Sequence, residues 1–434
     1  MARLLYSLVL YLSLPWILLR LVRRGRRNPD YRERWWERFG LITPVRGAPI
    51  WVHAVSVGET QAVLPLVRRL ADLHPDTPIL LTTTTPTGAA HVLRVMPPDV
   101  EHRYAPYDLP HAVEGFLGRA RPRLAIIVET ELWPNLFGAC ARRAIPVVVV
   151  NARLSERSAR GYRAPHLRAV VRAMMADVSA IGAQTEADAR RLGEIGAPGA
   201  VVSVTGSMKF DLPIPASAAE QGQVLRRQWG VERPVWIAAS THDGEDGTVL
   251  DAHARVRELI PGALLILVPR HPERFDDVHA LCVERGFTTV RRAQSQLCAP
   301  DCAVYLGDTM GELPVMVAAA DLCFMGGSLV PTGGHNVLEP AALGIPVISG
   351  RHVFNFQDIF DRLDEAGAVA YVDDAGQLAG TVVELMQAPS RRDEQGQRAL
   401  RFVEDNRGAV ERTLALVDPL LDRANARRPS EPSA

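Results

Sequence analysis

Short runs of apolar residues alternate with amphipathic segments along most of the chain, beginning at residue 50. The short runs predict buried strands, and the segments between them predict helices because their apolar residues recur every three or four positions. Such alternation is typical of parallel sheets whose strands are joined by helical crossovers. The predicted strands are 50–54, 79–83, 103–105, 124–128, 147–150, 178–181 and 201–205, followed by 235–239, 263–268, 288–290, 303–306, 322–325, 346–348 and 368–372.

A segment at 211–219 interrupts this pattern and divides it into two sets of strands. It contains Pro213 and Pro215 and has no apolar periodicity, so we interpret it as a linker. The chain has 434 residues, more than the ~100–200 that one domain usually takes. We therefore predict an α/β chain with a membrane anchor and basic segment at 1–40 and two Rossmann-like domains at 41–212 and 213–428.

Residues 4–22 differ from the rest of the chain because they are almost wholly apolar. A stretch of 19 residues is just long enough to cross a bilayer as a helix. Four arginines follow within 23–27, which by the positive-inside rule places the remaining chain on the cytoplasmic side of the membrane. A cleaved signal peptide would carry its charges before the apolar run instead of after it.

Two interpretations of this segment stay open. It is either a single membrane span or a helix that lies in the membrane interface, which Tyr6, Tyr11 and Trp16 favour because aromatic rings prefer the headgroup level. In both cases the basic residues of 23–38 would contact the anionic lipids of that membrane. The alternative for these basic residues is a solvated linker.

Composition narrows the functional classes. The chain has 49 basic and 49 acidic residues, so no overall field attracts nucleic acid. Five scattered cysteines argue for a reducing compartment and against a disulfide framework. The phosphate-binding, dinucleotide-binding and zinc-protease motifs are missing, as is a pair of aspartates two apart at a strand end. We therefore expect no cofactor and no metal held by the protein.

The segment 324–348 carries the strongest local signal for a ligand. A predicted strand ends in the glycine pair 326–327, a second pair follows at 333–334, and a predicted helix spans 337–343. Glycines allow an anion to approach the backbone, and the start of a helix attracts negative charge, so this segment predicts a phosphate-binding loop. Asn336 and Glu339 also have the spacing of a capping box, which needs no ligand.

Residues directly after the other strands add candidate side chains, because ligands of doubly wound sheets lie beyond the carboxyl ends of the strands. Glu59 is either a general base or only a glutamate in the first turn of a helix. Glu129 and Glu131 lie two apart, so one of them is expected to face a cleft. Lys209 is placed to neutralise a phosphate or a carboxylate.

In the second half of the chain, candidate side chains also directly follow predicted strands. Arg270 follows a strand and could bind a phosphate through two parallel hydrogen bonds. Thr309 and Glu312 follow another strand, and their spacing also fits a capping box.

Six ordered motifs together resemble one family, the 3-deoxy-D-manno-octulosonic acid (Kdo) transferases of lipopolysaccharide synthesis. They lie at 53–60, 129–135, 151–155, 206–211, 269–272 and 334–340. The resemblance implies a GT-B glycosyltransferase in which two Rossmann-like domains face an interdomain cleft. It further implies transfer of Kdo from CMP-Kdo to the lipid A precursor lipid IVA, with inversion and without a required metal, at the cytoplasmic face of the inner membrane.

The resemblance also implies roles for individual residues. Glu59 would be the base, and Glu129 and Lys209 would support the transition state. The residues implied in binding CMP are Pro269, Arg270, Met310, Gly311, Glu312, Asn336, Val337, Leu338 and Glu339. Two rival interpretations are a nucleotide-sugar epimerase with a similar double Rossmann body and a noncatalytic membrane-bound module that binds lipid or nucleotide.

Overall fold

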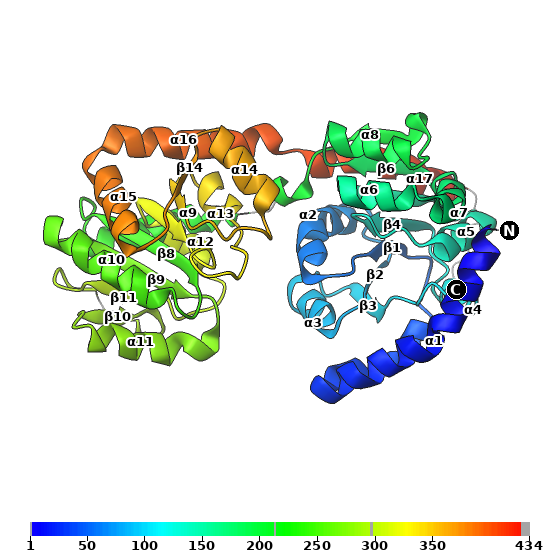
Figure 1. The fold of residues 1–434 in the computed structure, drawn as a ribbon, viewed down its shortest axis with the longest axis horizontal. Coiled ribbons are helices and arrows are strands. Elements are labelled where there is room, and N and C mark those ends of the chain that lie inside the picture. Colours follow the sequence, from blue (N-terminus) through cyan, green and yellow to red (C-terminus); the bar gives the residue numbers. More distant parts are fainter. Residues whose placement is uncertain (1, 212–213, 296–297, 427–434) are drawn as a thin grey trace. The chain divides into compact units, whose positions relative to one another are not determined.

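The computed structural model describes residues 2–211, 214–295 and 298–426, and these form two compact α/β units. The first unit comprises residues 1–212 and 406–434, and the second comprises residues 213–405 (Figure 1). All fourteen predicted strands are present, with ends shifted by at most three residues. The predicted α/β fold class is confirmed.

The first unit contains a seven-stranded parallel sheet in the order β3-β2-β1-β4-β5-β6-β7. Its strands are β1 Ile50–His53, β2 Ile79–Thr83, β3 Val100–Tyr104, β4 Leu124–Val128, β5 Val147–Ala152, β6 Ala180–Ala183 and β7 Val202–Val204. Its helices are α1 Ala2–Arg27, α2 Val57–Leu73, α3 Pro86–Val95, α4 Pro110–Ala120, α5 Pro134–Arg142, α6 Glu156–Tyr162, α7 Pro165–Met175, α8 Glu186–Glu194 and α17 Ala409–Ala426. Short 3-10 turns are η1 Pro29–Arg32, η2 Trp35–Phe39, η3 Gly199–Val201 and η4 Met208–Asp211.

The central strands of this sheet are buried on both faces, which explains their unbroken apolar sequences. Trp51 of β1 packs in one core with Phe116 of α4 and Phe137 of α5. Val52 of the same strand points to the opposite core, where Leu66 of α2 lies. Helices α2, α4 and α5 therefore cover the sheet with their apolar stripes.

The second unit repeats this plan with the strand order β10-β11-β9-β8-β12-β13-β14. Its strands are β8 Val235–Thr241, β9 Leu264–Pro269, β10 Thr289–Arg291, β11 Val304–Leu306, β12 Leu322–Met325, β13 Val347–Ser349 and β14 Val369–Tyr371. Its helices are α9 Ala216–Trp229, α10 Asp246–Leu259, α11 Phe275–Glu284, α12 Leu313–Ala318, α13 Leu338–Ala342, α14 Gln357–Glu365, α15 Ala375–Gln387 and α16 Pro389–Asn406, and its 3-10 turns are η5 Pro272–Arg274 and η6 Arg292–Gln294.

Two predicted boundaries differ from the structure. The second domain was predicted to run to residue 428, but α17, red in Figure 1, belongs to the first unit. Val410, Leu414 and Val417 of α17 are buried in the same core as Val52, which explains why the helix packs there. The predicted linker 211–219 is also too long, because α9 already begins at Ala216; residues 212–213 of it lie outside the described part.

Helix α1 is the one helix of the described chain that is long and apolar enough to cross a membrane. It nevertheless packs against the first unit along one side: Arg3 forms an ion pair with Asp177 at 2.7 Å, and the Ser7 hydroxyl donates to Asn135 Oδ1 at 2.9 Å. Figure 1 shows the beginning of α1 beside α5 and α7. The other side of α1 is exposed and apolar.

Both sheets reverse their strand order at one point, β1 beside β4 in the first unit and β8 beside β12 in the second. Loops that leave two strands at such a point diverge and form a crevice, the usual ligand position in this architecture. Near these edges three non-glycine residues have left-handed backbone, namely Glu129 at φ 59°, Asn151 at φ 53° and Ser240 at φ 59°. Strained backbone of this kind is concentrated at functional sites.

Candidate active site

Glu59 lies in the first turn of α2, directly after β1. Its carboxylate accepts hydrogen bonds from the Val55 N–H at 2.8 Å and from the Ser56 hydroxyl at 2.9 Å. Ser56 in turn caps the helix by accepting from the Glu59 N–H at 3.3 Å. Glu59 thus helps to cap the start of α2, which is one of the two alternatives left open by the sequence, although its carboxylate binds the N–H of Val55 instead of the N-cap N–H of a standard capping box.

The surroundings of Glu59 also suit a base. Burial raises the pKa of its carboxyl to about 7, and the negative charges of Glu129 and Glu131 add to this effect against the hydrogen bonds from Val55 and Ser56. A general base works best when its pKa lies near the working pH. Capping fixes the orientation of this carboxylate and burial sets its basicity, so the two interpretations are compatible.

Glu129 and Glu131 follow β4, the strand beside β1. The Glu131 carboxylate accepts from the Trp133 indole N–H at 2.8 Å, and burial raises the pKa of Glu131. Glu129 has left-handed backbone and donates its N–H to the Val150 carbonyl at 2.9 Å. The structure therefore brings three carboxylates to the switch point of the first sheet.

Lys209 lies in the 3-10 turn after β7. Asn151, which is fully buried, accepts from the Met208 N–H at 3.1 Å and so fixes the start of this turn. Asp211 at the end of the turn accepts from the N–H groups of Gly408 and Val410 before and within α17. The position of Lys209 thus depends on Asn151, which is buried, and on Asp211, which is partly buried. Their supporting role could not be recognised from the sequence.

His53 at the end of β1 is a polar residue that our sequence-based site did not include. It is almost fully buried, and its Nδ1 is hydrogen-bonded to the Thr82 hydroxyl at 2.9 Å. Its Nε2 has no hydrogen-bond partner within the described chain. Burial lowers the pKa of His53 to about 4, so its ring is neutral at pH 7. Its position in the motif at 53–60 was the signal that could have identified it.

In the second unit, the predicted phosphate-binding loop needs a correction. The N–H groups of Gly327, Ser328 and Leu329 after β12 all donate to the carboxylate of Glu245, at 2.6, 3.0 and 2.9 Å. Glu245 follows β8, is fully buried, and also accepts from the His242 N–H at 2.9 Å. The amides that we assigned to a phosphate are therefore already bound to a carboxylate of the chain, which holds the two loops of the switch point together.

The helix after this loop also differs from our prediction. It is α13, with only five residues, so its dipole is weak, and Val337 occupies the N-cap position. The predicted capping box is wrong in detail, because the Asn336 amide donates to Glu339 Oε1 at 3.3 Å and Asn336 Oδ1 accepts from the Leu338 N–H. Burial raises the pKa of Glu339, and the charge of Arg270 opposes this.

Arg270 follows Pro269, the last residue of β9. Its N–H donates to the Thr241 carbonyl at 3.0 Å, which places it beside the loop that begins at β8. The Arg270 side chain is exposed. It is therefore a cation open to solvent at the same sheet edge as Glu245.

Met310, Gly311 and Glu312 lie after β11. Met310 is exposed and Gly311 has a positive φ of 86°. Glu312 is bound to Arg292 through two hydrogen bonds of 2.7 and 3.1 Å and accepts from the Thr309 hydroxyl. The predicted Thr309–Glu312 capping box is not formed, because Glu312 itself occupies the N-cap position of α12.

Two histidines that we did not select meet at the switch point of the second sheet. Nε2 of His242 lies 2.7 Å from Nε2 of His335. His271 packs edge-on against His242, with ring centroids 5.2 Å apart. The signal available in the sequence was their position, since His242 directly follows the strand β8 and His335 lies in the motif at 334–340.

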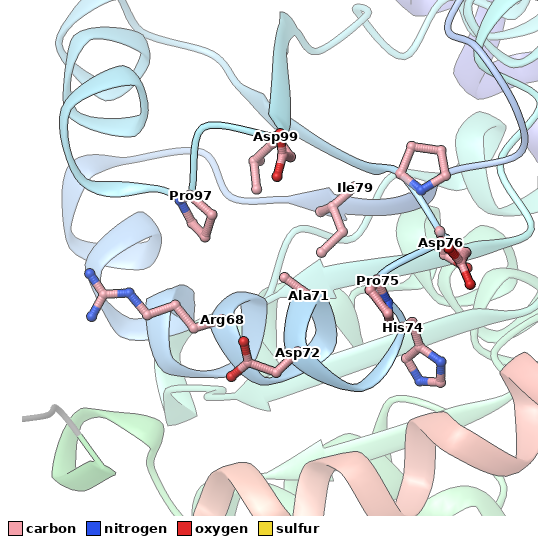
Figure 2. Close-up of a pocket in the computed structure, with 12 residues that line it drawn as sticks. Arg68, Ala71, Asp72, His74, Pro75, Asp76, Ile79, Pro97 and Asp99 are labelled. Carbon is pink, nitrogen blue, oxygen red and sulfur yellow. The ribbon is translucent and has the colours of Figure 1, made fainter.

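A pocket of about 530 Å³ lies elsewhere, at the amino ends of β2 and β3 (Figure 2). Its lining includes Asp72 and His74 near the end of α2 together with Ile79 and Asp99. The candidate residues of the first unit lie at the carboxyl ends of the strands instead. The pocket is therefore separate from the candidate site.

No group of three or more histidine, cysteine, aspartate or glutamate side chains within the described ranges is arranged to hold a metal ion. All five cysteines are buried and unpaired.

Comparison with known proteins gives three results. Residues 33–212 match a family model described as 3-deoxy-D-manno-octulosonic-acid transferase (kdotransferase). The chain is 40% identical over 427 residues to the 3-deoxy-D-manno-octulosonic acid transferase of Haemophilus influenzae, covering 98% of this chain and all of that protein. It is 38% identical to the enzyme of the same name from Bordetella pertussis, covering 97% of this chain and all of that protein.

Among solved structures, the UDP-GlcNAc 2-epimerase of Neisseria meningitidis has a TM-score of 0.56 and covers 86% of this chain and all of its own. Its sequence identity is only 13%, so the similarity concerns the double Rossmann, GT-B-like fold.

Proposed function

Because the chain belongs to the 3-deoxy-D-manno-octulosonic acid (Kdo) transferase family, we propose that it transfers Kdo from CMP-Kdo to lipid IVA, with inversion and without a required metal ion. Family membership makes the chain a glycosyltransferase of lipopolysaccharide biosynthesis. The donor, the acceptor and the stereochemistry form our proposal. The epimerase alternative has only similarity of fold in its favour.

The observation that carries the proposed mechanism is the buried Glu59 carboxylate with a pKa of about 7. Glu59 accepts the proton of an acceptor hydroxyl while the hydroxyl oxygen forms a bond to the anomeric carbon of Kdo. The bond from that carbon to the phosphate oxygen breaks, and CMP departs with the electron pair. One base and one leaving group on opposite faces of the sugar suffice for inversion.

Glu129 and Lys209 are assigned to the support of the transition state. A cation stabilises charge that develops on a departing phosphate, and a carboxylate stabilises a sugar carbon that becomes electron-poor. Glu129 has left-handed backbone, and buried Asn151 fixes the turn that carries Lys209. Both features are consistent with side chains that are held in place for catalysis.

For the donor we assign Pro269, Arg270, Met310, Gly311 and the segment 336–339. Arg270 is exposed and its charge acts on Glu339, which suits a cation that contacts the phosphate of CMP. The carboxylate of Glu312 is already bound to Arg292 and Thr309, so we assign Glu312 to fixing the Met310–Gly311 turn.

Helix α1 is assigned to the membrane interface instead of a span. Leu4, Leu5, Leu8 and Leu12 are exposed on it, whereas Arg3 and Ser7 bind the body of the first unit. A helix that crossed the bilayer would have to break these contacts. Lying in the cytoplasmic leaflet of the inner membrane, it would keep the protein close to an acceptor with acyl chains.

The test of the proposed activity is incubation of the full chain with CMP-Kdo and lipid IVA in lipid vesicles, with products identified by mass. A product heavier than lipid IVA by one or more Kdo residues is expected, also in the presence of a chelator. Absence of such a product with an active preparation, or a requirement for added metal, would contradict the proposal. Vesicle flotation of Leu8→Glu compared with the wild type tests α1, with weaker binding expected.

A further inference from the structure

The His242–His335 pair of the second unit is not explained by the roles assigned above. Two imidazole nitrogens 2.7 Å apart need one proton between them, since two lone pairs or two N–H groups would repel. In the neutral pair, one ring donates and the other accepts. Adding a proton to the pair gives a positive charge that must find a partner.

Among the described residues, the groups around the pair leave no carboxylate free to be that partner. Arg270, Arg274 and His271 all oppose a positive charge on His242. Glu245 favours it, but this carboxylate already accepts four backbone N–H bonds. The remaining carboxylates of these elements are bound elsewhere or open to solvent. Asp246 binds Arg274 and Thr241, and Glu339 binds Asn336. Asp243 is fully exposed and pairs with Arg274 at 3.9 Å, and Glu273 lies 3.9 Å from the His271 ring.

The site is built to hold these two rings. Glu245 fixes both loops, since it binds the His242 N–H and the three amides after β12. Gly327 has a φ of 68°, and a Cβ there would lie 3.0 Å from the His335 ring. Only glycine therefore allows the ring to occupy this position, and the loop geometry and the histidine pair depend on each other.

We propose that the His242–His335 pair is a proton-accepting subsite for an oxyanion of the activated sugar acid, so that donor binding takes up a proton from solution. The inference rests on the proposed function, because it concerns the donor of that reaction. The oxyanion is the phosphate or the carboxylate of the donor, and both would pair with the imidazolium that forms.

The energetics are consistent with proton uptake near neutral pH. Burial, together with His242, Arg270 and His271, lowers the pKa of His335 to about 4, so the empty pair is neutral at pH 6.5. An opposite charge within ~4–6 Å changes a pKa by about 1 to 3, enough to bring the pair close to pH 7. Donor affinity should therefore decrease as the pH rises from about 4, the pKa of His335 in the empty pair, towards the pKa of the occupied pair, and become constant above it.

The experiment is calorimetric titration of the full chain with CMP at pH 6.5, in buffers of different ionisation enthalpy. The wild type should bind more protons per CMP than His242→Gln or His335→Gln, by at most about one proton. One oxyanion stabilises one positive charge on the histidine pair. The control is His279→Gln, which removes a histidine of α11 from the same unit and should behave as the wild type. CMP also titrates, but this contribution is common to all four proteins.

Free Kdo in place of CMP distinguishes the source of the oxyanion, because it supplies a carboxylate without phosphate. A proton difference with either probe supports the subsite and identifies the group. Equal proton uptake in the wild type and both variants, with either probe, would overturn the inference, and so would failure of both probes to bind. Because product formation is measured separately, a protein that transfers Kdo but shows no difference refutes the inference alone.

Discussion

The two sheets of this protein have nearly the same architecture but opposite chemistry at the edge where ligands are expected. The switch point of the first sheet gathers carboxylates, Glu59, Glu129 and Glu131, and burial raises the pKa of Glu59 and Glu131. The switch point of the second sheet gathers histidines and Arg270, and burial lowers the pKa of His242 and His335. One edge is thus suited to accept protons at neutral pH, and the other to attract anions.

In each unit the fold supplies a position and the loops supply the function. In both units a glutamate follows the first strand of the sheet, Glu59 after β1 and Glu245 after β8. Burial raises the pKa of Glu59 against only two hydrogen bonds, and Glu245 is bound differently, since its carboxylate accepts four backbone N–H bonds. The first glutamate is therefore assigned to chemistry and the second to structure.

The largest expected effect comes from Glu59→Gln. It should lower kcat for Kdo transfer by roughly 100- to 10,000-fold, the usual contribution of a general base. Affinity for CMP, measured by calorimetry, should not change, because the residues assigned to CMP belong to the second unit. Removal of a buried negative charge should leave the thermal stability at pH 8 equal or higher.

Glu131→Gln is the matched control for Glu59→Gln, because it neutralises a carboxylate of the same edge that is bound to Trp133. It should retain most of the activity. A Glu59→Gln protein with rates close to the wild type would show that Glu59 is only a capping residue.

Glu245→Gln should have the next largest effect, on stability. An amide cannot accept all four backbone N–H bonds, and buried donors would remain unpaired, so the free energy of unfolding should fall by about 3 kcal/mol. The Michaelis constant for the donor should rise as well, because the loop after β12 loses its fixed position. Urea unfolding and donor titration measure the two effects.

Asp243→Asn controls for the loss of a carboxylate from the same loop, since Asp243 is fully exposed and its ion pair with Arg274 is long, at 3.9 Å. Its stability should match that of the wild type. If Glu245→Gln is equally harmless, the carboxylate does not organise the loops.

The third largest effect should be the dependence of kcat/KM and of stability on pH. Protonation of Glu59 removes the base, so kcat/KM should fall about tenfold per pH unit below a pH of about 7. Stability changes in the opposite sense: because the folded pKa lies above the ordinary value of 4.5, the contribution of this group is fully present below that value and is lost as the pH rises to about 7. If kcat/KM does not decrease at acidic pH, Glu59 is not the general base.

The smallest effects concern the strained backbone at the two edges. Asn151→Gly keeps the left-handed conformation accessible and loses only the bond to the Met208 N–H, whereas Asn151→Ala adds strain of about 1 kcal/mol. Ser240→Gly should be neutral or stabilising by a similar amount. Thermal unfolding of the three variants tests this order, and an alanine variant at least as stable as the glycine variant would contradict it.

The strand pattern and the motif positions were predictable because both depend on short-range sequence. A run such as 124–128 has one burial pattern in any parallel sheet, and residues after such strands must lie at one edge. The partners of those residues were not predictable. Nothing near Glu245 in the sequence indicates that it binds the amides of residues 327–329, and His242 and His335 are separated by 92 intervening positions.

By itself the sequence determined the two α/β units, the apolar first helix and the family. Only the tertiary structure decided how the side chains of these elements are used. The apolar stripe of α17 predicts a helix but not the sheet that it covers, and the spacing of Asn336 and Glu339 predicts a cap that the five-residue α13 does not form. Periodicity is a property of neighbouring residues, whereas burial, charge and hydrogen bonding depend on residues that folding alone brings together.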